Sequence, residues 1–338
     1  TAGWLMGAYS SDLQQALKAA GHEPGVYPSW VDEDVPSQGL RISIESPRYS
    51  TGYGDFIRVP TVLVENHRFK PYRQRVLGTR VMLEQSLRSV ARDADAIARA
   101  KHADRATQAD ALAVRWERDP VPLEYRAFKG YRYDEQASPV SGARELRWTG
   151  EAQLQSLPVY GTRMVEAAPI PAAWWILPGN PALLDLLQAH GIRTEPLATP
   201  RRMTLQRVQM ANGLQRDSFQ RSEVGMELPP GSVRVPSDQP LQLLAAALLE
   251  PASQDSALAM GWYDRALPGE SALPRHLLAP MAEAMMAQDA TLRRAFEKAL
   301  HDDAAFAADP KARLRWWEAR SPYGDRTLWT YSVLSEPR

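Results

Sequence analysis

The chain has 338 residues, of which 44% are hydrophobic and 24% are charged, and this composition is that of a folded globular protein rather than a disordered or fibrous one. Forty basic and forty acidic side chains cancel, so no overall charge attracts nucleic acid or an anionic membrane. No apolar run reaches the roughly 20 residues of a membrane span, and the absence of cysteine excludes disulfides and thiolate metal sites. We expect neither a nucleic-acid nor a membrane partner, and the length predicts two domains.

The first hundred residues predict a short helix, a loop-rich stretch, one strand and a long helix. Residues 9 to 21 carry Leu and Ala at helical spacing, whereas residues 24 to 54 are rich in Pro, Gly, Ser and Asp. The β-branched run Val59 to Val64 predicts a central strand, apolar on both faces, in a helix-covered sheet. Residues 71 to 104 predict one long helix with an apolar stripe, which consists of Val76, Leu83, Leu87, Val90, Ala94 and Ile97.

The pattern changes after a polar stretch, and we place a domain boundary near residue 110. Between 111 and 236 we expect short strands, an αβ unit over residues 171 to 197, and a hairpin with arms at 224 to 228 and 233 to 235. Residues 238 to 320 are rich in Ala, Leu and Met and predict helices. The expected organisation is an α/β region at 1–110 and an α+β accessory region at 111–338.

The histidines do not occur at the spacings of a self-contained zinc site. No His-x-x-Glu, His-x-x-x-His or His-x-His arrangement exists among the six, which are His22, His67, His102, His190, His276 and His301. Phosphate-binding glycine loops and Gly-x-Ser-x-Gly elbows are also missing from the sequence. We therefore predict no metal ligands within this chain.

Glu65 is the residue with the clearest chemical potential, because it directly follows the run Val59 to Val64. Ligand sites of helix-covered sheets collect at the carboxyl ends of strands, where apolar neighbours raise the pKa of a carboxylate toward that of a general base. The alternative is a structural carboxylate paired with one of the arginines that follow, which are Arg68, Arg73 and Arg75. The spacing alone leaves both interpretations open.

Two parts of the sequence resemble a known family. The segment SPRYSTGYGDFIRVPTVLVENHRFKPYRQRVLGT is similar to the C-terminal part of the catalytic domain in bacterial zinc carboxypeptidase-like metallopeptidases, the family that includes carboxypeptidase A. The segments SDQPLQLLAAALLEPASQDSALAMGWYD and DDAAFAADPKARLRWWEARSPYGD resemble the C-terminal extension of one bacterial branch. The resemblance implies that residues 1 to 110 are the last part of a helix-covered mixed sheet that starts upstream.

The resemblance also implies roles for individual residues. Glu65 corresponds to the general base and acid, and Tyr49, or in second place Tyr53, corresponds to a loop tyrosine that donates a hydrogen bond to the peptide substrate. The family's zinc ligands have no counterpart here, so the resemblance implies a zinc enzyme whose ligands precede Thr1 and a chain that is inactive alone. It also implies a periplasmic or secreted location. The competing expectation is a binding or scaffolding protein that has the same fold without the metal.

Overall fold

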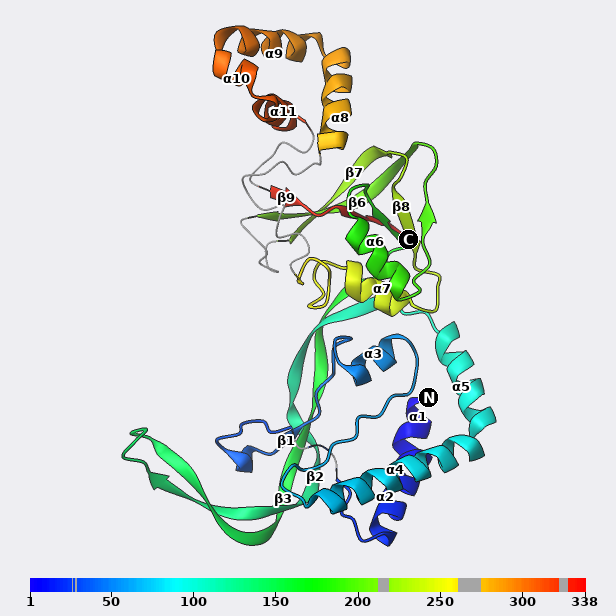
Figure 1. The fold of residues 1–338 in the computed structure, drawn as a ribbon, viewed down its shortest axis with the longest axis vertical. Coiled ribbons are helices and arrows are strands. Elements are labelled where there is room, and N and C mark those ends of the chain that lie inside the picture. The colour runs from blue at the N-terminus through cyan, green and yellow to red at the C-terminus, as the bar shows by residue number, and fades with distance from the viewer. Residues whose placement is uncertain (26, 28, 212–218, 261–274, 322–327) are drawn as a thin grey trace. The chain divides into compact units, whose positions relative to one another are not determined.

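The computed structural model describes residues 1–25, 27, 29–211, 219–260, 275–321 and 328–338. The chain divides into two compact units, Thr1–Ala167 and Ala168–Arg338 (Figure 1). Helices occur in both units, together with a three-stranded sheet in the first and a larger antiparallel sheet in the second. The α/β class expected from the sequence is therefore present. No helix among the described residues is both long enough and apolar enough to cross a bilayer.

The N-terminal helices of the first unit pack against one long helix. α2 contributes the buried side chains Leu13 and Leu17, which lie in a cluster with Val81 and Met82 of α4. The helices are α1 (Ala2–Trp4), the π-helix η1 (Leu5–Tyr9), α2 (Ser10–Ala19), α4 (Tyr72–Arg92) and α5 (Ala94–Ala106). The predicted helix at 71–104 is thus two helices, because the backbone leaves helical geometry at Asp93, where φ is −103° and ψ is 14°.

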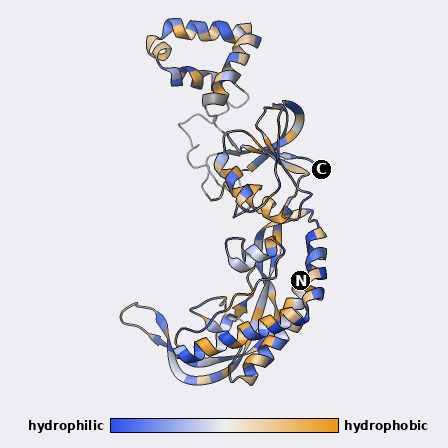
Figure 2. Ribbon diagram, turned by 45° about the vertical axis from the view of Figure 1, so that its right-hand side comes forward, coloured by the Kyte–Doolittle hydropathy of each residue, from blue (hydrophilic) through white to orange (hydrophobic). Residues whose placement is uncertain are grey.

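The stripe on α4 that the sequence marks as a core face is largely exposed. Val76, Leu83, Leu87 and Val90 retain between 46% and 72% of their accessible surface. Figure 2 shows hydrophobic positions recurring between hydrophilic ones along this long helix. The residues that pack against α2 lie at other positions of the same helix. The described part of the first unit therefore leaves an apolar helix face without the layer that such a face normally covers.

The strand predicted at Val59 to Val64 is not formed, and this prediction is wrong for the described structure. These residues have no regular secondary structure, and none of the N–H groups of residues 61 to 66 donates to a backbone carbonyl of the described chain. Val62, Leu63 and Val64 are 42%, 59% and 37% exposed. An apolar composition favours a strand only where a neighbouring strand is present to pair with it, and none is present beside this segment in the described unit.

Two long strands replace the short ones expected after residue 110. β2 (Ala111–Ala137) and β3 (Arg144–Pro169) form a ribbon whose turn is closed by the N–H of Ser138 donating to the carbonyl of Ala143. β3 also pairs in parallel with the short β1 (Leu40–Arg41). This pairing joins the ribbon to the N-terminal residues, which is why the division between the units follows Ala167 and not residue 110.

The second unit is built around a sheet in which all the strand pairings of the described residues are antiparallel. The strand order is β5-β8-β4-β10-β6-β7, with β9 paired to β6. The central strand β4 is fully buried, and Trp174 and Trp175 are at most 2% exposed. The strands are β4 (Ala173–Ile176), β5 (Glu195–Pro196), β6 (Arg201–Ala211), β7 (Phe219–Leu228), β8 (Val233–Pro236), β9 (Leu328–Thr330) and β10 (Val333–Glu336).

The hairpin predicted between residues 224 and 235 is wrong in its pairing, although both arms are strands. β7 pairs with β6 along ten residues, and β8 pairs with β4 and β5. The turn at residues 229 to 232 instead brings β8 beside β5. Leu197, which directly follows β5, donates its N–H to the carbonyl of Ser232. Alternating apolar residues predicted the strands but not their partners, because several strands offered an equivalent apolar face.

Helices are present in the second unit where the sequence predicts them, except that residues 251–260 of the predicted helical stretch 238–320 form turns and residues 261–274 lie outside the described part of the chain. α6 begins with a cap in which Asn180 Oδ1 accepts the N–H of Leu183 at 3.1 Å, and it ends before Gly191, whose φ is +73°. α8 to α11 share an aromatic cluster that includes Phe296 and Trp317. The helices are α6 (Pro181–Ala189), α7 (Gln242–Leu249), α8 (Arg275–Gln288), α9 (Ala290–Asp302), α10 (Ala304–Ala308) and α11 (Pro310–Glu318).

Candidate functional site

The two candidate substrate tyrosines belong to the short helix α3 (Ser50–Phe56). Tyr49 is its N-cap residue and is 60% exposed. Tyr53 lies inside the helix, is half-buried, and donates its N–H to the carbonyl of Tyr49 at 2.7 Å. The phenol of Tyr49 is therefore accessible to a ligand from solvent, whereas that of Tyr53 is more restricted.

Close backbone packing holds α3 against the segment that leads to Glu65. A Cβ atom at Gly54 would lie 2.0 Å from Thr61 Oγ1 and 2.7 Å from the carbonyl oxygen of Val59. The N–H of Val59 donates to the carbonyl of Gly54 at 2.8 Å. Only glycine permits this approach. The tyrosine helix and residues 59 to 61 are thus one packed element.

A polar contact on the other side fixes the end of the segment to α4. The side-chain amide of Asn66 donates to Thr79 Oγ1 at 2.9 Å, and that hydroxyl donates to the carbonyl of Arg75 at 3.0 Å. Glu65 directly precedes Asn66, and its side chain is exposed. The carboxylate therefore stands at the surface between two anchored points, α3 at one end and α4 at the other.

The ion-pair interpretation of Glu65 has no counterpart in the geometry. In the described part of the chain, Glu65 forms no ion pair with Arg68, Arg73 or Arg75. The guanidinium of Arg68 lies over the ring of Phe69 at 4.7 Å instead. The apolar enclosure expected around Glu65 is not formed by the described residues either, since the side chains before it are exposed. The Glu65 side chain is open to solvent.

Asp55 and His67 are two further polar residues near this segment. The Asp55 side chain is exposed overall, but neighbouring atoms remove part of the hydration of its carboxyl group, which raises its pKa, while the charge of Arg58 acts in the opposite direction. In the described chain, His67 forms no hydrogen bond with Glu65. Its Nδ1 accepts the N–H of Phe69 at 3.3 Å instead. Glu65 is the only one of the three consecutive residues 65 to 67 whose side chain forms no hydrogen bond within the described chain.

The described residues do not fit a zinc ion. They contain no group of three His, Asp or Glu side chains that could hold a metal. Glu65 also forms no hydrogen bond with Tyr49 or Tyr53 within the described region, so the three candidate residues are not joined directly. Sequence reasoning found the residues themselves but missed the contacts that place them, which are the Gly54 approach and the Asn66–Thr79 hydrogen bond.

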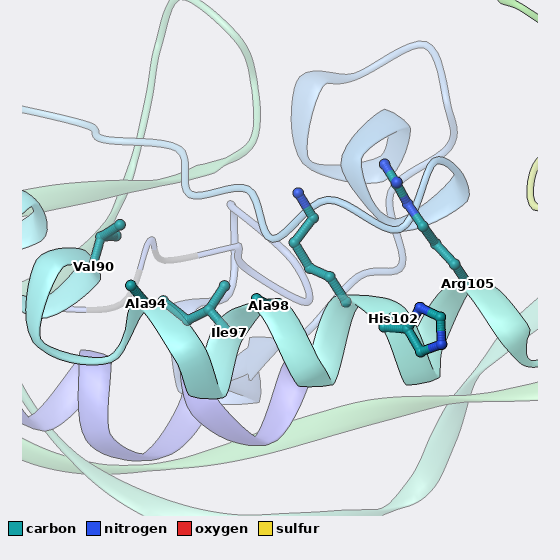
Figure 3. Close-up of a pocket in the computed structure, with 7 residues that line it drawn as sticks. Val90, Ala94, Ile97, Ala98, His102 and Arg105 are labelled. Carbon is teal, nitrogen blue, oxygen red and sulfur yellow. The ribbon is translucent and has the colours of Figure 1, made fainter.

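An open groove continues the exposed stripe of α4 along α5. Its volume is about 490 Å³, and small apolar side chains form one part of it while basic side chains extend from the other (Figure 3). The apolar part is lined by Val90, Ala94, Ile97 and Ala98, and the basic part by Lys101, His102 and Arg105. The apolar part of the groove extends the exposed apolar stripe of α4 onto α5. None of the residues that line the groove belongs to the segment that carries Glu65.

Comparison with known proteins adds no relative to this picture, since no protein-family model, curated protein or solved structure matches the chain. What the chain does is therefore proposed from its residues and their geometry.

Proposed function

We propose that this chain is the C-terminal portion of a zinc carboxypeptidase-like metallopeptidase that hydrolyses peptide bonds, with Glu65 as its general base and acid. The observation that carries the proposal is the state of Glu65, which is exposed and has no ion-pair partner in the described residues although three arginines follow it closely. An exposed ion pair is worth only about 0–1 kcal/mol, so no strong contact holds Glu65 to these arginines and its carboxylate stays available to a ligand. An unpaired carboxylate that stands between two anchored elements supports a chemical role.

The proposed chemistry uses the two protonation states of one carboxyl group. Glu65 accepts a proton from the water that attacks the scissile carbonyl, and the protonated carboxyl group then donates that proton to the leaving amine. Tyr49, with Tyr53 as second candidate, donates a hydrogen bond to the peptide substrate. Zinc ligands must come from outside the described residues, because these contain no metal-binding group of their own.

The uncovered apolar surfaces of the first unit support the same proposal. The run Val62 to Val64 lacks a paired strand, and the stripe on α4 lacks a covering layer in the described chain. These are the two kinds of surface that meet where a helix covers a sheet. They agree with a catalytic domain whose remaining strands lie in a longer polypeptide.

Turnover of the polypeptide that also contains the zinc ligands tests the proposal. Glu65→Gln keeps the size and hydrogen-bonding capacity of the side chain but removes its basicity, so kcat should fall by about 10² to 10⁴ while zinc content stays the same. The matched control is Glu45→Gln, which alters another exposed carboxylate of the same region and should leave kcat unchanged. Near-normal turnover of the Glu65 variant rules out the role of Glu65.

A non-catalytic binding or scaffolding role is the second candidate, and the observation that favours it is the lack of a metal-binding group in the described residues. The two candidates differ in metal content once the longer polypeptide is purified and dialysed. One tightly held zinc per molecule supports the peptidase, and no retained metal supports the binding protein.

A further inference from the structure

The outer part of the β2–β3 ribbon, residues 129 to 154, is here called the distal ribbon. Figure 1 shows it extending away from the helices of its unit. Its cross-strand contacts hold it together: the rings of Tyr133 and Trp148 meet at 5.2 Å, and Arg132 pairs with Glu151 at 3.3 Å. An isolated two-stranded ribbon is at best marginally stable in water and needs a further packing layer.

Large apolar side chains of this ribbon are exposed. In the distal ribbon, Tyr131 is 55% exposed, Trp148 is 54% exposed and Leu154 is 68% exposed. Val121, Leu123 and Tyr125 of β2 are exposed by more than 60%. Aromatic side chains bury about 150–250 Å² each, so the half-exposed Tyr131 and Trp148, together with Leu154, offer a few hundred Å² within the distal ribbon, and the polar residues around them supply the rest of the ~800 Å² per partner of a specific interface.

The charges of the distal ribbon indicate which partner fits. Four basic and four acidic residues cancel, and they are Lys129, Arg132, Arg144, Arg147, Asp134, Glu135, Glu145 and Glu151. Several of them pair across the ribbon, such as Arg144 with Glu135 at 3.1 Å. A surface with mixed, balanced charge gives no preference for a polyanion or for a strongly basic partner. It is compatible with a two-fold dimer, in which the same surface of two copies meets without a net repulsion between like charges.

We propose that the distal ribbon is a homodimer interface. Two copies pack their ribbons face to face about a two-fold axis, with Tyr131, Tyr133 and Trp148 of each at the centre and the mixed charges at the rim. The product is a two-layer, four-stranded structure, which supplies the packing layer that a single ribbon lacks. Aromatic residues at the centre of an interface carry most of its binding energy. This inference does not rest on the function proposed for Glu65.

Sedimentation of the 338-residue chain from about 1 to about 100 μM, a range that covers weak and moderate dimers, tests the proposal. A concentration-dependent dimer is expected. Trp148→Ser and Tyr131→Ser should each raise its dissociation constant by at least about tenfold, because each removes two side chains from a symmetric interface. Leu87→Ser is the matched control, since Leu87 is 72% exposed on α4 and lies outside the ribbon. Circular dichroism of every variant verifies that it is folded.

The outcomes distinguish a dimer contact at the distal ribbon from a contact at the exposed stripe of α4. A chain that stays monomeric throughout the concentration range overturns the proposal. A dimer that Leu87→Ser weakens and the ribbon variants do not also overturns it, and would place the contact on the α4 stripe. Hydrogen exchange at the two ends of the concentration range gives an independent measurement, because the amides of residues 129 to 136 and 145 to 153 should exchange more slowly in the dimer. Equal exchange at both concentrations contradicts the proposed interface.

Discussion

The two units use the same kind of apolar pattern with opposite results. In the second unit, the apolar run that forms β4 is paired on both sides, and Trp174, Trp175 and Ile176 are at most 2% exposed. In the first unit, the run at Val62 to Val64 has no strand beside it, and its side chains are between 37% and 59% exposed. The difference lies in the partners available and not in the apolar character of the segments.

The contrast shows that the first unit exposes apolar surface that no other described element covers. The second unit brings its own neighbouring strands, including β10 from the C-terminal end of the chain. The first unit provides α2 for one side of α4 and leaves the other side open. Exposed apolar surface of this extent is typical of interaction sites. The residue proposed for catalysis, Glu65, is at the edge of this open surface.

Truncation of a leucine should give the largest difference between the two units in the free energy of unfolding. Leu205 is fully buried in the cluster around Trp175, so Leu205→Ala should reduce the free energy of unfolding of the second unit by about 2–5 kcal/mol. Leu87→Ala removes the same atoms from an exposed site and should change stability by less than about 0.5 kcal/mol. Denaturant titration measures both. A loss above about 2 kcal/mol for Leu87→Ala would contradict the open α4 stripe.

The packing of α3 predicts a smaller effect in the first unit. Gly54→Ala places a methyl group against Thr61 and the carbonyl of Val59 and should cost about 1–3 kcal/mol, as over-packing does. Gly7→Ala is the control, because a Cβ there meets no atom within 4 Å and should not destabilise the protein. Thermal unfolding compares the two variants. Equal melting temperatures would show that α3 and residues 59 to 61 are not packed as the structure has them.

The stability of the first unit should depend on pH through Asp93, which lies between α4 and α5. Arg92 and, next, Trp4 hydrogen-bond to Asp93 and lower its pKa from 3.8 to about 2. A lowered folded-state pKa means that this stabilisation is complete above about pH 4 and is lost as the pH falls toward 2. The melting temperatures of wild type and Asp93→Asn should therefore differ at neutral pH and converge on acidification. A difference that stays constant down to pH about 2 would contradict the assignment.

The sequence predicted the elements with local signals well. The unit at residues 171 to 197 was recognisable because Gly191 ends its helix, and the Asn180 cap that the structure shows is a second signal that acts within a few residues. The strands β7 and β8 were also recognisable, but their partners were not. Pairing depends on contacts between distant segments, and the register of residues 201 to 228 is set by β6, which no local turn signal near residue 230 reveals.

The candidate site was predictable only in part. Glu65, Tyr49 and Tyr53 followed from residue type and from the resemblance, and their roles stay predictions. The Asn66–Thr79 hydrogen bond joins residues thirteen positions apart, and the Gly54–Thr61 approach depends on a backbone path that no pattern specifies. The apolar run before Glu65 predicted a strand because composition reports what a segment can bury and does not report whether a partner is present.

Hydrogen exchange of the 338-residue chain at low concentration tests the contrast between the units most directly. The amides of β4 are paired on both sides and should be protected up to the stability of the second unit, whereas those of residues 61 to 66 should exchange almost as fast as in an unfolded peptide. Such a result supports an open surface beside Glu65. Protection of residues 61 to 66 comparable to that of β4 would contradict it, because this segment would then already be paired within the chain.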